Sequence, residues 1–196
     1  MANVNNKKSA SSTACASKIS VCAKSIALFI SADGFMFLSA TKGFVFMLAL
    51  ACDHGGYELM QKIREFLELR EVIYSDFGTF SKESCDYPEI AARAANAISS
   101  GDCDKGIFIC STGIGISIAA NKTPGVRAAL CTDTYMAEMT RRHNDANVLA
   151  LGAHVTTEVV ALRIVEVFLN TMFEGGRHAR RVDMLNAMDV AKKNTQ

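Results

Sequence analysis

From residue 45 onward, short apolar runs alternate with segments of helical periodicity, and this alternation limits the chain to few folds. The first run, Val45–Cys52, is continuously apolar, and the next segment, Tyr57–Leu69, repeats its apolar residues at helical spacing. The pattern predicts strands at Val45–Cys52, Val72–Phe77, Gly106–Cys110, Val126–Cys131 and Val148–Leu151. It predicts helices at Tyr57–Leu69, Pro88–Ser99, a stretch ending at Asn121, Tyr135–Arg142, Glu158–Phe173 and Arg177–Lys192.

Strands that alternate with helices of this length indicate an α/β fold, a doubly wound (Rossmann-like) sheet of five parallel strands. We expect the strand order 2-1-3-4-5, in which a ligand crevice opens between strands 1 and 3 at their carboxyl ends. The two most unusual loops follow these two strands, at residues 53–56 and 110–115. Topology and loop composition therefore predict the same site.

The first 46 residues differ from the rest. They hold five of the chain's 21 basic residues and one of its 20 acidic residues, and they are rich in Ser, Ala and Lys. This composition is compatible with an organellar targeting peptide, and equally with an extension without function that precedes a start at Met47. We expect residues 1–46 to be poorly ordered and residues 47–196 to form the functional domain.

Charge and cysteine content exclude several classes of protein. The formal net charge is +1, so nothing points to a nucleic-acid or membrane partner. No run of 18 apolar residues indicates a transmembrane helix. The seven cysteines are odd in number and contain no C-x-x-C pair, which argues against a zinc ribbon or a disulfide framework. A reducing, cytoplasmic location is the simplest expectation.

The loop after the third strand reads Cys-Ser-Thr-Gly-Ile-Gly-Ile-Ser over residues 110–117. Gly113 and Gly115 allow a tight turn that points several backbone N–H groups at one spot, where a phosphate or a reaction oxyanion could bind. A dinucleotide-binding turn is the alternative, although the three-glycine pattern is incomplete and does not follow the first strand. Cys110 stands at the strand end, as a nucleophile, a general base or a buried structural thiol.

Three further polar groups are candidates. Asp53 and His54 lie in the facing loop, where they could bind a polar ligand. His143 and Asn144 precede the fifth strand, and His143 could act as an acid, a base or a helix cap. Arg177, His178 and Arg181 begin the last helix, with the arginines four apart on one face. They could clamp a phosphate or form a solvated helix start.

From about Met47 onward, the chain resembles the ribose-5-phosphate isomerase B family, within a wider group that includes galactose 6-phosphate isomerases. The matching motifs are residues 52–56, 86–88, 109–122, 124–127, 143–148 and 174–178, with Arg181. The resemblance implies an aldose–ketose isomerase that interconverts ribose 5-phosphate and ribulose 5-phosphate through an enediolate, in the non-oxidative pentose phosphate pathway. It implies no metal and no organic cofactor.

The resemblance also implies residue roles. Cys110 would move the proton between the two carbons, Thr112 would assist at the substrate oxygens, and His143 would help to open the furanose ring. The anion hole would comprise the backbone N–H groups of Ser111, Thr112, Gly113, Ile114 and Gly115. Asp53 and Asn144 would bind hydroxyls. The phosphate would be held by Arg177, Arg181, His54 and His178. The family's site implies a homodimer, or a dimer of dimers, with the last helix packed on the partner subunit.

Three positions depart from relatives. His154 stands where many have a phosphate-binding arginine, and Ser111 where glycine is common. Ile116 occupies the position of a glutamate base in a sister subgroup, which favours Cys110 as the base here. An allose 6-phosphate or galactose 6-phosphate isomerase remains an alternative, as does a nucleotide- or flavin-binding module, which would not need Cys110. A phospho-receiver domain would need an aspartate in place of Cys110.

Overall fold

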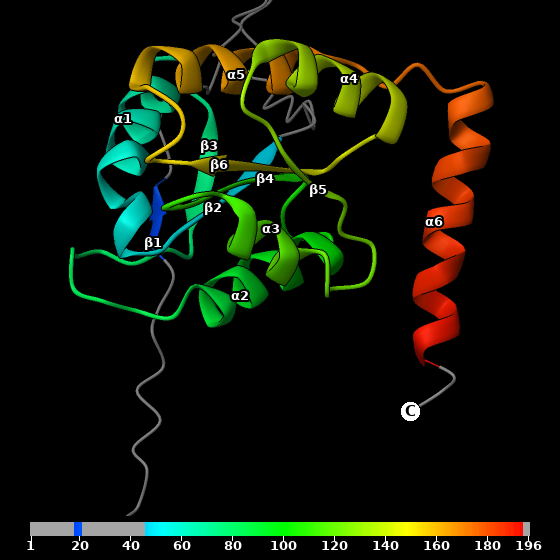
Figure 1. Ribbon diagram of the computed structural model, residues 1–196, viewed down its shortest axis with the longest axis horizontal. Coiled ribbons are helices and arrows are strands. Elements are labelled where there is room, and N and C mark those ends of the chain that lie inside the picture. Colours follow the sequence, from blue (N-terminus) through cyan, green and yellow to red (C-terminus); the bar gives the residue numbers. More distant parts are fainter. Residues whose placement is uncertain (1–17, 21–45, 194–196) are drawn as a thin grey trace, which may run out of the picture.

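The computed structural model describes residues 18–20 and 46–193, with side chains for residues 46–189. Strands and helices alternate through most of this length (Figure 1). The strands are β1 (Lys18–Ser20), β2 (Met47–Cys52), β3 (Ile73–Asp76), β4 (Lys105–Cys110), β5 (Ala128–Leu130) and β6 (Val148–Gly152). The helices are η1 (His54–Gly56), α1 (Tyr57–Glu68), α2 (Tyr87–Ser99), α3 (Ile114–Ala120), α4 (Thr134–Asn144), α5 (Glu158–Asn170) and α6 (Arg177–Lys193).

The strands form one sheet in the order β1-β3-β2-β4-β6-β5. The five strands from β2 to β6 are parallel, which confirms the predicted α/β sheet. The predicted strand order is wrong, because β6 lies between β4 and β5 and gives 2-1-3-5-4 for these five strands. β1 adds an antiparallel edge next to β3.

The exchange of the last two strands follows from their burial. All five residues of β6 are buried, so this strand needs a neighbour on each side. The three residues of β5 are only half-buried, which is consistent with its position as the edge strand of the sheet. Val126 and Arg127 were predicted as strand, but the Val126 N–H donates to the Thr123 carbonyl within a turn.

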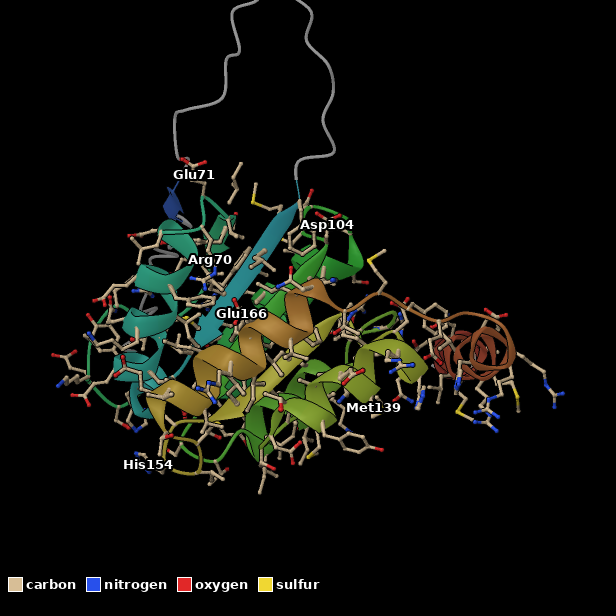
Figure 2. The ribbon with its side chains drawn as sticks, turned by 90° about the horizontal axis from the view of Figure 1, so that it is seen from above. Arg70, Glu71, Asp104, Met139, His154 and Glu166 are labelled. Carbon is tan, nitrogen blue, oxygen red and sulfur yellow. The ribbon has the colours of Figure 1, made fainter. Side chains whose placement is uncertain are left out.

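Alternating side chains of the strands face two helical layers. Leu48 and Leu50 pack in the core beneath α1, α4 and α5, whereas Ala49 and Ala51 face α2 and α3. Small residues on the second face let α2 approach the sheet closely. Arg70, just after α1, and Glu166 of α5 form an ion pair of 3.1 Å across the first layer (Figure 2).

Helix α6 covers neither face of the sheet. In both views it stands beside the body of the molecule, next to the end of α4 (Figures 1 and 2). Asp189 of α6 contacts the turn before β5, where its Oδ2 accepts the Gly125 N–H at 2.8 Å. The packing of this helix on a partner subunit stays a prediction.

Apart from β1, the segment 1–46 that we expected to be a separate extension lies outside the described residues, save for Phe46. Its proposed targeting role and its poor order therefore stay predictions. Among the residues that the structure describes, no helix combines the length and hydropathy of a membrane span.

Candidate active site

The loops after β2 and β4 lie against each other at the carboxyl edge of the sheet. The Asp53 N–H donates to the Ile109 carbonyl at 3.2 Å, which joins the two strand ends. Two residues after Asp53, a Cβ added to Gly55 would lie 2.2 Å from the Ser111 Oγ. The loops approach so closely that only glycine fits at position 55 next to this serine.

Cys110 is the last residue of β4 and lies where these two loops meet. Its side chain is buried, with 4% exposure, and its Sγ accepts the Gly113 N–H at 3.1 Å. The sulfur therefore acts as a hydrogen-bond acceptor, at the strand end that faces the loop after β2.

The buried thiols elsewhere have different surroundings. The Cys52 Sγ faces the Thr79 carbonyl at 4.0 Å and the Cys131 Sγ faces the Ala129 carbonyl at 3.8 Å, so both act as donors. Burial raises the pKa of Cys52 to about 12 and the pKa of Cys131 to about 12, and it raises the pKa of Cys103 to about 11. These three thiols are neutral at physiological pH.

The glycines of the β4 loop shape its backbone. Gly113 has a φ of 77°, and a Cβ there would lie 2.8 Å from the Leu151 carbonyl carbon and 2.9 Å from the Gly152 nitrogen. The Gly115 backbone rests against the Tyr87 ring, 2.7 Å from the position of a Cβ. Only glycine allows both the left-handed turn and these approaches, and the Gly113 N–H that follows from this turn is directed at the Cys110 Sγ.

Asp53 and His54 are each held in place by one hydrogen bond from a backbone N–H. Asp53 is buried, and its Oδ1 caps the following turn by accepting the Gly56 N–H at 2.9 Å. The His54 Nδ1 accepts the Cys85 N–H at 3.2 Å, so the ring proton of the neutral imidazole lies on Nε2. One carboxylate oxygen and one ring N–H thus remain for a ligand.

Two other candidates, Thr112 and His154, belong to the same loop or border it. Thr112 is exposed, and its Oγ1 accepts the Ile114 N–H at 3.3 Å. The His154 N–H donates to the Ser111 carbonyl at 2.9 Å, while its side chain is exposed in the turn between β6 and α5 (Figure 2). The structure thus gathers Asp53, His54, Cys110, Ser111, Thr112, Gly113, Ile114, Gly115 and His154 at one edge, here called the cysteine group.

The remaining candidates gather elsewhere. His143 and Asn144 end α4, and Arg177, His178 and Arg181 begin α6. The Glu174 N–H donates to the Arg142 carbonyl at 3.1 Å and brings the start of α6 to the end of α4. These five residues form a second cluster, here called the histidine group.

The two groups lie at opposite edges of the sheet. Cys110 pairs with Gly152 at the carboxyl end of β6, whereas α4 ends just before Val148, at the amino end of the same strand. Four residue steps of about 3.3 Å separate these ends by about 13 Å along the strand alone. Within one chain the structure therefore does not bring Cys110 and His143 together.

Two imidazoles stack inside the histidine group. The ring centroids of His143 and His178 are 4.2 Å apart and their planes differ by 7°. The Glu174 Oε2 lies 3.8 Å from the His143 Nε2 and 3.7 Å from the His178 Nε2. Burial, followed by the charges of His143 and Arg177, lowers the pKa of His178, and the hydrogen bond from Arg142 lowers the pKa of Glu174.

His143, Glu174 and His178 also have the spacing of metal ligands, with donor atoms within 4.8 Å of one another. Their surroundings do not fit a metal ion. Glu174 is paired with Arg142, and the His178 Nε2 already accepts the Arg177 Nε–H at 3.3 Å. Parallel rings cannot both direct a nitrogen lone pair at one ion about 2 Å away.

Sequence reasoning missed Arg127 and Glu174 as contributors to the histidine group. Arg127 donates to the Asn144 and Asp145 carbonyls and, through Nη1, to the Asn186 Oδ1 of α6. Both residues belong to motifs that carry the family resemblance, which is the signal that could have marked them. Their partners are far apart in the sequence and could not be read from it.

A groove of about 420 Å³ separates α6 from β5 and the end of α4. Its lining is partly apolar, with Val126, Ala128, Leu185 and Met188. It adjoins the histidine group through Asn144 and does not include Cys110. This hollow therefore lies apart from Cys110.

Comparison with known proteins identifies relatives over the same region. The family model described as Ribose/Galactose Isomerase matches residues 48–185. The chain is 46% identical over 142 residues to "Ribose-5-phosphate isomerase B" of Escherichia coli, which covers 72% of this chain and 95% of that protein. It is 43% identical over 148 residues to a putative sugar phosphate isomerase of Bacillus subtilis, over 75% and 98% of the two chains.

Solved structures agree with these matches. Ribose-5-phosphate isomerase B of Clostridium thermocellum is 50% identical, with a TM-score of 0.74 over 75% of this chain and 99% of that chain. The Mycoplasma genitalium enzyme, solved with bound ribulose-5-phosphate, is 38% identical, with a TM-score of 0.71 over 74% and 96%. The residues matched by the family model, 48–185, include both the cysteine group and the histidine group.

Proposed function

We propose that the cysteine group and the histidine group perform one reaction, at a site shared by two copies of the chain. The chain belongs to the ribose/galactose isomerase family. It is an aldose–ketose isomerase that interconverts ribose 5-phosphate and ribulose 5-phosphate. The family implies a role in the pentose phosphate pathway. Sugar phosphates are accordingly its proposed ligands, in the cytoplasm unless residues 1–46 direct the chain elsewhere.

Cys110 is the proposed base. As a thiolate it removes the proton from C2 of open-chain ribose 5-phosphate, and the C2–H electron pair forms the enediolate double bond while O1 takes up negative charge. A proton then passes from O2 to O1, the electron pair on O2 forms the C2=O bond, and the thiol returns the carbon-bound proton to C1, which gives ribulose 5-phosphate. The observation that carries this assignment is the Gly113 N–H directed at Sγ in a buried position.

The β4 loop supplies the stabilisation of the enediolate. Backbone N–H groups from Ser111 to Gly115 lie in one tight turn, where they can share the negative charge of O1 and O2. Thr112 offers a hydroxyl that can move protons between these oxygens. Asp53, with Oδ2 left over from its capping bond, is the proposed acceptor for a sugar hydroxyl.

The histidine group supplies the steps before isomerisation. His143 opens the furanose ring by taking the proton from the anomeric hydroxyl and giving a proton to the ring oxygen. Arg177 and Arg181, both exposed, hold the phosphate, assisted by His54 and His154 of the cysteine group. Asn144 binds a hydroxyl.

A homodimer reconciles these roles with the geometry. Since Cys110 and His143 lie at opposite edges of the sheet in one chain, a complete site needs the cysteine group of one copy and the histidine group of another. A two-fold arrangement then creates two equal sites. Helix α6 and its adjoining groove form the proposed contact for the partner.

The test is an isomerase assay of the full-length chain with chelator present. Wild type should convert ribose 5-phosphate, and Cys110→Ala should lose about 10²–10⁴-fold in kcat. Cys103→Ala is the matched control, because Cys103 is a buried thiol before β4 at the other edge and should keep full activity. Survival of activity in Cys110→Ala would refute the thiol base.

The same assay with allose 6-phosphate and galactose 6-phosphate separates the five-carbon from the six-carbon assignment. We expect kcat/KM to be highest for ribose 5-phosphate, in line with the relatives named above. Turnover of a hexose phosphate alone would move the chain to the six-carbon branch of the family.

A further inference from the structure

We propose that His178, together with Glu174, positions the imidazole of His143 and does not bind the substrate phosphate. This inference rests on the proposed role of His143 in ring opening. It revises the expectation from the sequence, in which His178 joins Arg177 and Arg181 as a phosphate ligand.

The first support is the burial of His178 beneath His143. The side chain of His178 is 7% exposed and that of His143 is 38% exposed. The two rings stack at 4.2 Å and 7°. His143 therefore rests one face on a buried aromatic platform and leaves its edge open, which fixes the plane of the ring that must meet the sugar.

The second support is the hydrogen bond of His178. Its Nε2 accepts the Arg177 Nε–H at 3.3 Å, so this nitrogen carries no proton. The ring is therefore neutral, with its proton on Nδ1. Burial and the neighbouring charges of His143, Arg177 and Arg181 lower the pKa of His178, against a smaller opposite effect of Glu174. A buried ring with an accepting Nε2 offers that nitrogen to no phosphate oxygen.

The third support is the way in which Glu174 is held. Its Oε1 accepts the Arg142 Nε–H at 2.5 Å, and its N–H donates to the Arg142 carbonyl at 3.1 Å. The other oxygen, Oε2, faces the Nε2 atoms of both imidazoles at 3.8 and 3.7 Å. A carboxylate fixed in this way lies beside the ring of His143, the group proposed to take up the proton of the anomeric hydroxyl.

The turn before α6 makes the arrangement possible. Gly175 and Gly176 have φ values of 65° and 55°, and a Cβ added at either position would have no neighbour within 4 Å. The two left-handed residues reverse the chain between Glu174 and His178, so that both reach the end of α4. Glu174 and His178 thus join α4 to α6 at His143.

The experiment separates positioning from phosphate binding in the full-length chain. Three quantities are compared: net isomerisation of ribose 5-phosphate, inhibition by inorganic phosphate, and the exchange of substrate carbon-bound protons with D₂O in ribulose 5-phosphate. Ribulose 5-phosphate is acyclic because its C5 oxygen carries the phosphate. Exchange therefore needs the enediolate step and no ring opening.

For His178→Ala we expect kcat of net isomerisation to fall about tenfold or more, as for a misplaced acid–base group. Proton exchange and the inhibition constant of inorganic phosphate should change less than about threefold. Glu174→Gln should lower kcat of net isomerisation as well, with proton exchange and phosphate inhibition again changed less than about threefold. His178→Phe keeps an aromatic platform and should recover part of the loss.

Arg181→Gln is the contrasting variant, and it should raise the inhibition constant of phosphate about tenfold or more. The proposal is overturned if His178→Ala weakens phosphate inhibition as Arg181→Gln does while kcat is kept. It is equally overturned if exchange falls as far as net isomerisation.

A second measurement does not depend on turnover. The ring protons of His143 should carry an upfield shift in the NMR spectrum from the stacked His178 ring, and this shift should vanish in His178→Ala. Its absence from wild type would refute the stacking. A wild type without conversion or exchange would instead refute the proposed function, whatever the NMR spectrum shows.

Discussion

At the scale of single residues, the close approach of the loops after β2 and β4 depends on the missing side chain of Gly55. A Cβ there would lie 2.2 Å from the Ser111 Oγ and 3.3 Å from the Ser111 Cβ. We expect Gly55→Ala to lower the melting temperature and the isomerase activity, because the serine must move and takes the anion-binding backbone with it.

The double variant Gly55→Ala/Ser111→Gly tests this explanation. Removal of the serine side chain leaves only its backbone nitrogen, 3.3 Å from the new methyl group. Stability and activity measured over the double-mutant cycle should show recovery, with a coupling free energy of about 1 kcal/mol or more. Additive losses in the two single variants would contradict a direct clash.

Gly113 offers a second residue-scale prediction. Both Gly113 and Gly101 have a positive φ, 77° and 85°, but only Gly113 has backbone atoms within 3 Å of a Cβ position. Denaturant unfolding should show a cost of about 1 kcal/mol for Gly101→Ala, from the backbone strain alone. Gly113→Ala should cost more and abolish activity, and equal costs would refute the role of the close approach.

Residue types alone predicted the cysteine group well, since polar residues after neighbouring parallel strands meet at one edge. They could not show that the Gly113 N–H points at Cys110, because that contact depends on the φ of one glycine. They also grouped His178 with the arginines, because helical spacing does not show which side of α6 faces α4.

At the scale of elements, the pattern of apolar residues predicted every strand from β2 to β6 and the helices between them. It failed on the order of the last two strands. The choice depends on which strand is buried on both sides, and the three residues of β5 are too short a run to decide that from the sequence. The contacts of α6 were equally out of reach, because its partners lie in distant segments.

Arg127 ties three elements together. From the turn before β5 it reaches the carbonyls at the end of α4 and Asn186 on α6. We expect Arg127→Lys to lose the forked contacts, with faster amide hydrogen exchange over residues 177–189 and a higher KM for ribose 5-phosphate.

Arg93→Lys is the matched control for this prediction. Arg93 is exposed and makes one hydrogen bond, of 3.1 Å, to the Phe77 carbonyl on the other side of the sheet. The Arg93→Lys variant should leave amide hydrogen exchange in α6 unchanged. Equal protection of α6 in both variants would show that Arg127 does not hold this helix.

At the scale of the whole molecule, the separation of the two groups makes a quantitative prediction for mixed variants. Cys110→Ala and His143→Ala should each be inactive alone. In a dimer that combines one chain of each, one site carries both defects and the other carries neither.

Random re-association of equal amounts gives half of the dimers in mixed form, each with one of two sites intact. We therefore expect about a quarter of wild-type activity after co-refolding, from statistical pairing of symmetric dimers. A single-chain site would give no recovery at all. The measurement is the isomerase rate before and after co-refolding, with mass spectrometry to count the mixed dimers.

The sheet that keeps Cys110 and His143 at opposite edges also sets how the rate scales with the amount of protein. In a single chain, the cysteine group and the histidine group lie too far apart to contact the same sugar molecule. If the proposed dimer dissociates on dilution, each lone chain should be silent, and in that range we expect the rate to grow with the square of chain concentration rather than in proportion to it. We therefore expect turnover per chain to fall below the chain concentration at which the proposed dimer dissociates.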